Sequence, residues 1–456
     1  MLTTLVGVIV RTAPNTLSFD SHDTMPEIYG IKANVRKANE WVALSASRRT
    51  PNVLSVVDKQ LHAFKRRTLA HVFYDQNMKH IEDRIIEKIK GFTDLLGSAD
   101  DGLPVKEKNS WGSPTPMTNP CNWLSFDIIS DLTYSQSFNM LKSPELRWVP
   151  EVYTSMSYRS MVCLIQPKIF ECKLDRVLLA RLYKEIISAG TWIYERTKTR
   201  QSLGVNPDKK DIFSILMNAR DLKTGSEYKT KDLWIESILL LAAGADTTSA
   251  TMSAAFFYLL HNQAALSHLT AEVRATFTSE DEIRMGPKMN SCRYLQACIN
   301  ETMRLVPAVP NLSPRRVQAG GITVGGEYIP EGVNIGTSLY TLMRNEHYFQ
   351  KPNEFWPERW FVDPEAGVTP ESLALAQKVF CPFGMGPRSC VGWKLAWLEL
   401  NVTLARTLFL YDMRLPLGTD SFNKSTAARS DYDFQAWAIA SGGGHRAQFR
   451  RRHDLQ

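Results

Sequence analysis

The chain has 456 residues, of which 44% are hydrophobic and 22% charged, an ordinary composition for a globular protein with a large core. The formal net charge of +7 is mild for this length, and the basic clusters are short and lack interleaved aromatic residues, so nucleic-acid binding is not expected. Seven cysteines without any Cys-x-x-Cys spacing argue against a disulfide framework and a zinc knuckle.

The chain begins with a short apolar stretch, residues 2–10, which Arg11 ends. This stretch is too short to cross a bilayer, and no basic region precedes it as in a signal peptide. Its β-branched residues 6–10 predict a strand. No later stretch has the composition of a domain linker, so we expect a single domain over residues 1–456.

Most of the chain has the apolar periodicity of helices. This pattern predicts helices over residues 79–96, 123–138, 174–197, 212–220, 231–261, 264–277, 291–305 and 391–410. The Pro- and Ser-rich residues 97–119 predict a surface loop. Strand signals are few: residues 321–324 and 327–329 predict a hairpin that turns at Gly325 and Gly326. We therefore expect a mainly α fold with small β-sheets.

The helix predicted over residues 231–261 contains an unusual segment, Ala-Gly-Ala-Asp-Thr-Thr at residues 243–248. Glycine and polar residues are poor choices for a helix interior, so the segment predicts a local break in the helix. Such a break would let Thr247 offer a hydroxyl and Asp246 a path for protons. The alternative is a stripe of small residues that lets another helix pack closely.

Two charged residues, Glu301 and Arg304, are three positions apart and therefore lie on one face of the helix predicted over residues 291–305. An isolated pair of this kind is usually a surface salt bridge of little energetic value. Arg359 lies further along, in the aromatic segment 355–360. The spacing alone leaves open whether the three side chains meet.

Cys390 follows a Gly- and Pro-rich turn that starts at Phe383, and it precedes an apolar helix. The positive end of that helix dipole is expected to lower the pKa of the thiol and to favour metal ligation. Arg388 could meet an anionic group of the ligand, and Gly392 would let the backbone approach a flat, bulky molecule. The alternative is a buried free cysteine at a helix start.

The pattern Phe-x-x-Gly-x-Arg-x-Cys-x-Gly at residues 383–392 resembles the haem-binding loop of the cytochrome P450 family. This resemblance implies a P450-like fold in which Cys390 is the axial ligand of the iron of haem b. It also implies that Glu301, Arg304 and Arg359 form a buried ion network behind the cysteine loop. Residues 243–248 resemble the oxygen-activating groove of the family, in which Thr247 and Asp246 would govern proton delivery.

Residues 58–73 resemble the helix that crosses the haem edge in fungal members of the family. His62 takes the position where tryptophan is commoner, and the resemblance implies that four bases hold the haem propionates: His62, Arg66, Arg315 and Arg388. The alternative for His62 is a solvated or capping histidine. Lys65 and Arg67 are expected to form a solvated face.

The resemblance covers residues 6–415, and the two ends of the chain depart from it. Residues 7–15 resemble the first sheet strand, and the membrane anchor, hinge and first helix that usually precede it are expected to be missing. The glycine-rich residues 439–445, Ile-Ala-Ser-Gly-Gly-Gly-His, replace an apolar strand that normally reaches the substrate pocket. We therefore expect the far wall of the pocket to differ.

The resemblance implies a haem-thiolate monooxygenase of fungal secondary metabolism that hydroxylates, epoxidises or couples a hydrophobic small molecule. It would use O2 and electrons from NADPH through a separate reductase, since the sequence has no flavin or dinucleotide motif. Its location would be the cytosolic face of the endoplasmic reticulum membrane, or the cytoplasm or a peripheral position without an anchor. The expected substrate contacts are residues 30–57, residues 161–170, Ala242, Ala243, Ala308 and Val309.

Two alternatives remain from the sequence. The same scaffold can act without a reductase as an isomerase or dehydratase, although the presence of Asp246 and Thr247 counts against this. The chain could also be an inactive truncated copy or a non-catalytic haem binder.

Overall fold

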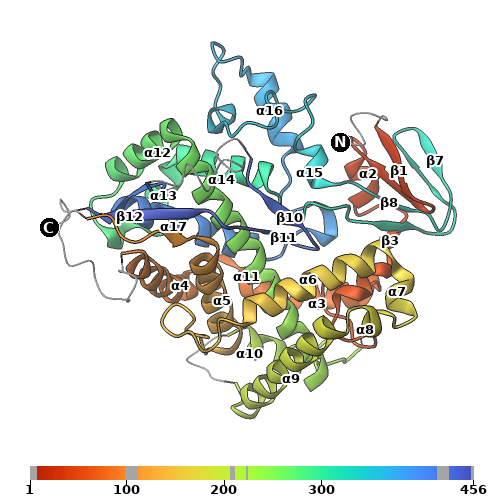
Figure 1. Ribbon diagram of the computed structural model, residues 1–456. Coiled ribbons are helices and arrows are strands. Elements are labelled where there is room, and N and C mark those ends of the chain that lie inside the picture. Colours follow the sequence, from red (N-terminus) through yellow and green to blue (C-terminus); the bar gives the residue numbers. More distant parts are fainter. Residues whose placement is uncertain (1–7, 98–109, 206–210, 222–223, 418–430, 453–456) are drawn as a thin grey trace.

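The computed structural model describes residues 8–97, 110–205, 211–221, 224–417 and 431–452. The predicted mainly α fold with small β-sheets is confirmed (Figure 1). Most of the apolar stretch 2–10 and of the predicted loop 97–119 lies outside the described residues. The longer helices are α3 Lys59–Ala70, α4 Asp75–Leu96, α5 Thr118–Tyr134, α6 Val149–Ile165, α9 Ala180–Ser202, α11 Thr230–His261, α12 Gln263–Thr276, α14 Arg293–Leu305, α16 Pro370–Val379 and α17 Trp393–Leu410.

Shorter elements connect these helices. The short helices are α2 Met25–Tyr29, α7 Pro167–Glu171, α8 Asp175–Leu178, α10 Ile212–Met217, α13 Pro287–Ser291 and α15 Leu339–Leu342. The strands are β1 Ile9–Ala13, β2 Thr16–Phe19, β3 Val35–Lys37, β4 Thr115–Pro116, β5 Arg315–Val317, β6 Ile322–Val324, β7 Glu327–Ile329, β8 Asn334–Gly336, β9 Tyr411–Arg414, β10 Phe434–Ala436, β11 Ala440–Gly442 and β12 Arg446–Arg451.

The predicted helices are present with shifted ends. The segment expected to be one helix over residues 174–197 is two, because Leu179 leaves the helical conformation between α8 and α9. Helix α5 ends at Ser135, whose φ of 54° is left-handed, rather than at residue 138. Helix α6 was not predicted, because apolar and polar residues alternate along it without a clear stripe.

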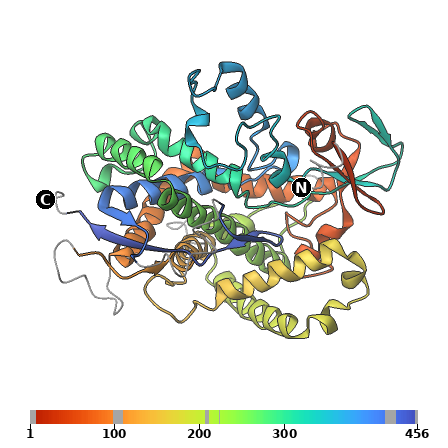
Figure 2. The same cartoon turned by 45° about the horizontal axis from the view of Figure 1, so that its top comes forward.

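Helix α11 passes through the middle of the molecule, and most of its side chains are buried (Figure 1, Figure 2). It packs against α5 on one side and α9 on the other. A helix that is apolar on nearly all sides needs such cover on every face, which explains its central place. The elements that carry the predicted site residues are arranged around it.

The predicted break in this helix is wrong, since α11 is helical without interruption from Thr230 to His261. A Cβ atom on Gly244 would lie 2.6 Å from Cγ1 of Ile129, so the glycine lets α5 approach closely. The Thr247 hydroxyl donates a 2.8 Å hydrogen bond to the Ala243 carbonyl and is thereby satisfied within the helix. Close packing, rather than a break, explains the small residue.

A five-stranded sheet with the order β1-β2-β8-β5-β3 lies at one side of the molecule, and the sheet β4-β12-β9 lies at the other (Figure 1). Strand β3 is antiparallel to β5, and this register sets Lys37 opposite Arg315. The predicted hairpin β6–β7 is confirmed, with Gly325 and Gly326 at φ of 59° and 84°. A two-residue hairpin turn of type I′ requires a positive φ at both of its central residues.

The glycine-rich segment 439–445 still contains a strand, because β11 pairs with β10 in an antiparallel hairpin. A Cβ atom on Gly443 would lie 2.2 Å from Oγ1 of Thr118. The missing side chain therefore lets the hairpin pack directly on α5. The expectation that the glycine run replaces the strand is corrected in this respect: the strand remains, and glycine changes how close it lies to its neighbour.

Candidate active site

The loop before Cys390 is built on two left-handed glycines, Gly384 and Gly386, at φ of 67° and 71°. The Cys390 N–H donates a 2.8 Å hydrogen bond to the Phe383 carbonyl and closes the loop. Helix α17 starts directly afterwards, with Gly392 as its N-cap residue. The loop therefore holds the cysteine at a fixed place at the N-terminus of a long helix.

The expected lowering of the Cys390 pKa is wrong for the free thiol. Although Cys390 is exposed, the protein atoms around its sulfur raise this pKa above its ordinary value by desolvation, while the Gly392 N–H and Arg66 act in the opposite direction without prevailing. Within the described residues, no group of three histidine, cysteine or acidic side chains could hold a metal ion.

Helix α3 contacts the cysteine loop. The Asp58 side chain caps this helix by accepting a 2.7 Å hydrogen bond from the Leu61 N–H. Arg66 donates hydrogen bonds to the Ser389 carbonyl and, at 3.1 Å, to its hydroxyl. Arg66 thus joins α3 to the residue that precedes the cysteine.

Three further predicted residues lie near each other as a cluster of bases. His62 is 6% exposed, so the solvated alternative is wrong. Burial and the nearby Arg388, Lys37, Arg66 and Arg315 lower the pKa of His62 to about 3, which leaves its imidazole neutral. Arg388 donates to the Val56 carbonyl at 2.7 Å, and Arg315 lies 4.8 Å from the ring of Tyr29.

This cluster fits an anionic ligand. In the part of the chain that the structure describes, no carboxylate lies within ion-pair distance of Arg315, Arg388 or Lys37. Their mutual repulsion contributes to the lowered pKa values of Lys37 and Arg388. Bases gathered without an acid are a donor set for external carboxylates, and haem carries two. Lys37 is absent from the predicted residues; its only sequence signal is a lysine in a strand-forming segment.

Lys65 is buried, and its expected place on a solvated face is wrong. It is 3% exposed and forms a 2.7 Å ion pair with Glu236 of α11. The other oxygen of Glu236 accepts a hydrogen bond from the Val53 N–H at 3.2 Å. The pair fixes α3 and the segment before it against α11. The prediction for Arg67 is confirmed, since its side chain is exposed.

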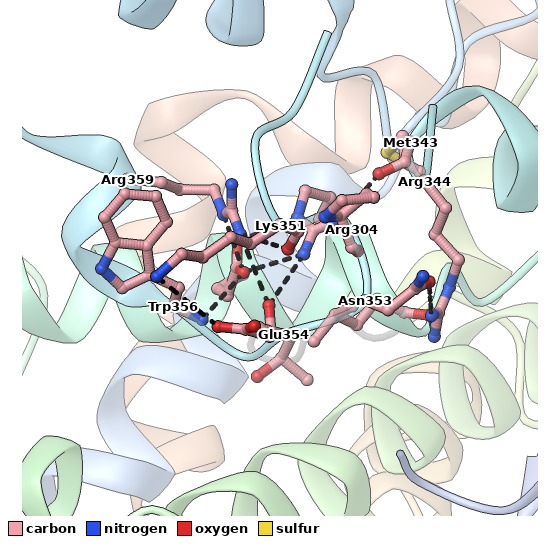
Figure 3. A network of polar contacts seen from close by, with 12 residues as sticks. Arg304, Met343, Arg344, Lys351, Asn353, Glu354, Trp356 and Arg359 are labelled. Carbon is pink, nitrogen blue, oxygen red and sulfur yellow. Dashed lines mark hydrogen bonds and ion pairs between the residues drawn. The ribbon is translucent and has the colours of Figure 1, made fainter. Parts of the chain in front are cut away.

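The structure brings Glu301, Arg304 and Arg359 together in a buried ion network. Arg304 donates two hydrogen bonds to the Glu301 carboxylate, at 2.9 and 3.0 Å, and Arg359 donates one at 2.9 Å. The indole N–H of Trp360 and the backbone N–H of Trp356 also donate hydrogen bonds to the Glu301 carboxylate. Figure 3 shows the guanidinium groups of Arg304 and Arg359 turned toward one another beside Lys351.

Burial alone would raise the pKa of Glu301, but Arg304, Arg359 and the Trp356 N–H outweigh it, and the pKa lies below its ordinary value. The remaining donors of Arg304 bond to the carbonyls of Met343 and Pro352 at 2.8 and 2.6 Å. The network therefore joins α14 to the segment 343–360, with two guanidinium groups sharing one carboxylate and bonding to backbone carbonyls through their remaining donors.

Asp246 borders a small polar cavity that lies between α5, α6, α11 and the β10–β11 hairpin. The cavity is lined by Thr118, Asn122, Thr154, Ser157, Ser249 and the residues Ile439 to Gly442. Burial raises the pKa of Asp246 to about 8, so its carboxyl group carries a proton at neutral pH. Ser249 donates to the Asp246 carbonyl at 3.1 Å and is not bonded to its carboxyl group.

Two predicted substrate-contact regions, at Ala308 and Met161, lie at or next to the same hairpin. The Ala440 N–H donates to the Ala308 carbonyl at 2.8 Å, and the Ile439 N–H donates to the Ser157 hydroxyl at 3.0 Å. Asn311 contacts the Met161 sulfur at 3.8 Å and donates to the Trp437 carbonyl at 2.6 Å. Asn311 was not predicted, because its partners are distant in the sequence.

Asp246→Asn is expected to become more stable relative to the unchanged protein as the pH rises from about 4 to about 8. The folded state keeps the Asp246 proton up to about pH 8, whereas the unfolded chain loses it near pH 4, so only the aspartate form is progressively destabilised. Urea unfolding of both proteins across this range measures the difference. A constant difference would contradict the raised pKa.

A mainly helical fold with a cysteine loop at the start of a long helix, beside a cluster of bases, fits the class of haem-thiolate proteins. The Cytochrome P450 family model matches residues 20–428. The chain is 32% identical to the cytochrome P450 monooxygenase poxM of Penicillium oxalicum, over 98% of this chain and 83% of that protein.

Two further relatives give the same result. The chain is 33% identical to the cytochrome P450 monooxygenase atnE of Emericella nidulans, over 91% of this chain and 80% of that protein. It is 31% identical to the cytochrome P450 monooxygenase apf7 of Gibberella fujikuroi, over 98% of this chain and 86% of that protein. The chain therefore belongs to the cytochrome P450 family and is an oxidoreductase of the monooxygenase class that uses haem iron and O2.

Proposed function

We propose that this protein is a monooxygenase of fungal secondary metabolism that hydroxylates, epoxidises or couples a hydrophobic small molecule. In this proposal Cys390 is the axial ligand of a haem b iron, and His62, Arg66, Arg315 and Arg388 bind its propionates. The observation that supports it most directly is the cluster of buried bases without a carboxylate partner among the described residues. The fungal relatives support the setting.

A bound haem would supply the activation of O2. The chain would position it: Phe383 closes the cysteine loop through its carbonyl, and Gly392 starts the helix behind the sulfur. Asp246 carries a proton at neutral pH next to the polar cavity, and it would be the proton source. Thr247 would pass that proton on by rotating its hydroxyl away from the Ala243 carbonyl.

Reduced protein exposed to carbon monoxide is expected to show the long-wavelength Soret band that gives cytochromes P450 their name. The thiolate of Cys390 causes this band, so Cys390→Ser is expected to lose it while keeping the helical far-UV circular dichroism spectrum. Cys381→Ser is the matched control, because this cysteine lies in the same loop region and is expected to leave the band unchanged. Persistence of the band in Cys390→Ser would overturn the assignment of the ligand.

Electrons would come from NADPH through a separate flavoprotein reductase. Turnover of a substrate panel with NADPH and a fungal P450 reductase, compared with turnover driven by peroxide alone, tests this step. Oxidised product that depends on the reductase supports the monooxygenase. Rearranged or dehydrated product without any electron donor would favour the isomerase or dehydratase alternative, and a normal carbon monoxide spectrum without any turnover would favour a non-catalytic haem binder.

We further propose that the protein lies on the cytosolic face of the endoplasmic reticulum. No described helix is long and apolar enough to span a membrane. Helices α7 and α8 lie at the edge of the molecule (Figure 1). Val177 and Leu178 of α8 are 74% and 64% exposed, and Ile165, the last residue of α6, is 61% exposed. These side chains could enter the interface of a bilayer.

The double variant Val177→Glu/Leu178→Glu is expected to bind vesicles of anionic phospholipid roughly tenfold more weakly or worse, because two apolar side chains no longer enter the bilayer. Flotation of the protein with the vesicles measures this. Val362→Glu, at an exposed position elsewhere on the surface, serves as the control and is expected to bind like the unchanged protein. Equal binding by all three proteins would contradict the proposed contact surface.

A further inference from the structure

Lys37 is the last residue of strand β3 and is buried, with an exposed fraction of 4%. It faces Arg315 across the β3–β5 pair, so the two basic side chains start from directly opposite positions in the sheet. Like charges in such positions repel each other and destabilise the pair. The arrangement therefore calls for a negative charge nearby.

The contacts of Lys37 do not supply that charge. Its ammonium group donates a hydrogen bond to the Leu54 carbonyl and lies 3.8 Å from the centre of the Trp41 ring. Neither partner is charged, and an ammonium group has three donors. Among the described residues, Lys37 has no carboxylate within ion-pair distance. A buried charge without a paired counter-charge is strongly unfavourable.

Lys37 and Arg388 converge on one short segment of chain. Arg388 donates to the carbonyls of Val56 and Val57, and Lys37 donates to the carbonyl of Leu54, two residues earlier. Burial, Arg315 and Arg388 together lower the pKa of Lys37 well below its ordinary value. The strand register beside Arg315 and the shared segment 54–57 beside Arg388 place the three bases in one region of the molecule.

We propose that Lys37 is a further haem-binding residue, whose ammonium group binds a propionate of the haem together with Arg315 and Arg388. The proposal rests on the haem site proposed above. A carboxylate at this place would pair with three cations that have no carboxylate within ion-pair distance among the described residues, and it would raise the pKa of Lys37 again. Lys37 would then hold the cofactor from the sheet, whereas Cys390 holds it from the helix α17 side.

The test compares Lys37→Met with the unchanged protein. Methionine keeps most of the length of the side chain but removes the charge and the ammonium group that lies over Trp41. Ferric haem transferred to a scavenging apomyoglobin is expected to leave the variant roughly tenfold faster or more, the effect of one lost hydrogen bond between charged groups. The reduction potential is expected to fall, because a positive charge near the haem favours the ferrous state.

The same measurement with haem dimethyl ester isolates the propionate. Esterification removes the negative charges, so Lys37→Met and the unchanged protein are expected to lose the ester at the same rate, within about twofold. Lys37→Gln, which can still bond to Leu54, is expected to behave like Lys37→Met, whereas Lys37→Arg is expected to restore retention of free haem. Lys32→Met, at an exposed position nearby, is the control.

The possible outcomes are distinct. An unchanged protein that does not bind haem through a thiolate would overturn the proposed function and this inference with it. An unchanged protein that binds haem normally, while Lys37→Met and Lys37→Gln retain haem equally well, would overturn the inference alone. A faster loss that is the same for haem and its dimethyl ester would show that Lys37 supports the fold without binding a propionate, and would also overturn it.

Discussion

Replacing Glu301 by glutamine is expected to destabilise the folded protein by about 3–5 kcal/mol, because it leaves Arg304 and Arg359 buried without a counter-charge. Both guanidinium groups lie in the interior, at 0% and 4% exposure, and neither can turn to water. Urea unfolding at pH 7, followed by far-UV circular dichroism at matched haem content, measures the loss.

The control for this change is Glu195→Gln. Glu195 pairs with Lys198 at the same spacing of three residues, but both side chains are more than half exposed. A pair in water contributes about 0–1 kcal/mol, so this variant is expected to unfold almost like the unchanged protein. Comparable losses in the two variants would contradict the role assigned to burial.

The effect of Glu301→Gln also depends on pH in a defined direction. The pKa of Glu301 is held below its ordinary value in the folded protein, so the contribution of its charge is fully present above the pKa of the unfolded chain. This contribution is lost as the pH falls through the folded pKa. The difference between the two proteins is therefore expected to shrink toward acidic pH, opposite to the trend with pH that Asp246→Asn predicts.

How far the sequence predicts this molecule depends on how local the relevant interactions are. Helices such as α4 and α14 have one apolar stripe, and their predicted starts lie four and two residues from the observed ones while their ends agree. The cysteine loop is equally local, since its glycines, cysteine and following helix are contiguous. Helix α6 lacks such a stripe and is not predicted, and part of its cover comes from residues 39–44, which lie far earlier in the chain.

The errors at the site have the same cause. Lys65 has the sequence surroundings of a surface lysine, and only Glu236, 171 residues away, makes it a buried one. In the sequence Gly244 suggests a helix break. In the structure it instead makes room for Ile129 of the neighbouring helix α5. Lys37 lies opposite Arg315, and only the pairing of strand β3 with β5 brings the two together. Charge and glycine are informative in sequence, but their partners decide what they mean.

Gly386→Ala is expected to displace the cysteine loop and to destabilise the protein by about 2–5 kcal/mol, the sum of a left-handed alanine and an overpacked contact. Its Cβ atom would lie 2.0 Å from the carbonyl oxygen of Tyr29 in α2, and backbone atoms cannot turn aside. The intensity of the carbon monoxide band per protein and the urea midpoint measure the two effects.

Gly384→Ala separates the clash from the backbone strain. Gly384 has nearly the same φ as Gly386, but an added Cβ would meet no atom closer than 4.0 Å. This variant is therefore expected to lose only about 1–2 kcal/mol and to keep the band. Equal effects in the two variants would show that conformation alone, and not the contact with α2, makes glycine necessary at position 386.

The contact with Tyr29 makes the effect of Gly386→Ala reach beyond the sulfur. The Tyr29 hydroxyl accepts a 2.7 Å hydrogen bond from the Thr337 N–H, and its ring lies against Arg315. A loop that pushes α2 away would therefore also move a base proposed to bind a propionate. We expect Gly386→Ala to release haem faster than Gly384→Ala. The first variant displaces both the loop and Arg315, whereas the second strains only the loop and leaves Arg315 in place. Transfer of haem to apomyoglobin from both variants measures this difference, and equal rates would show that α2 does not link the two sides of the site.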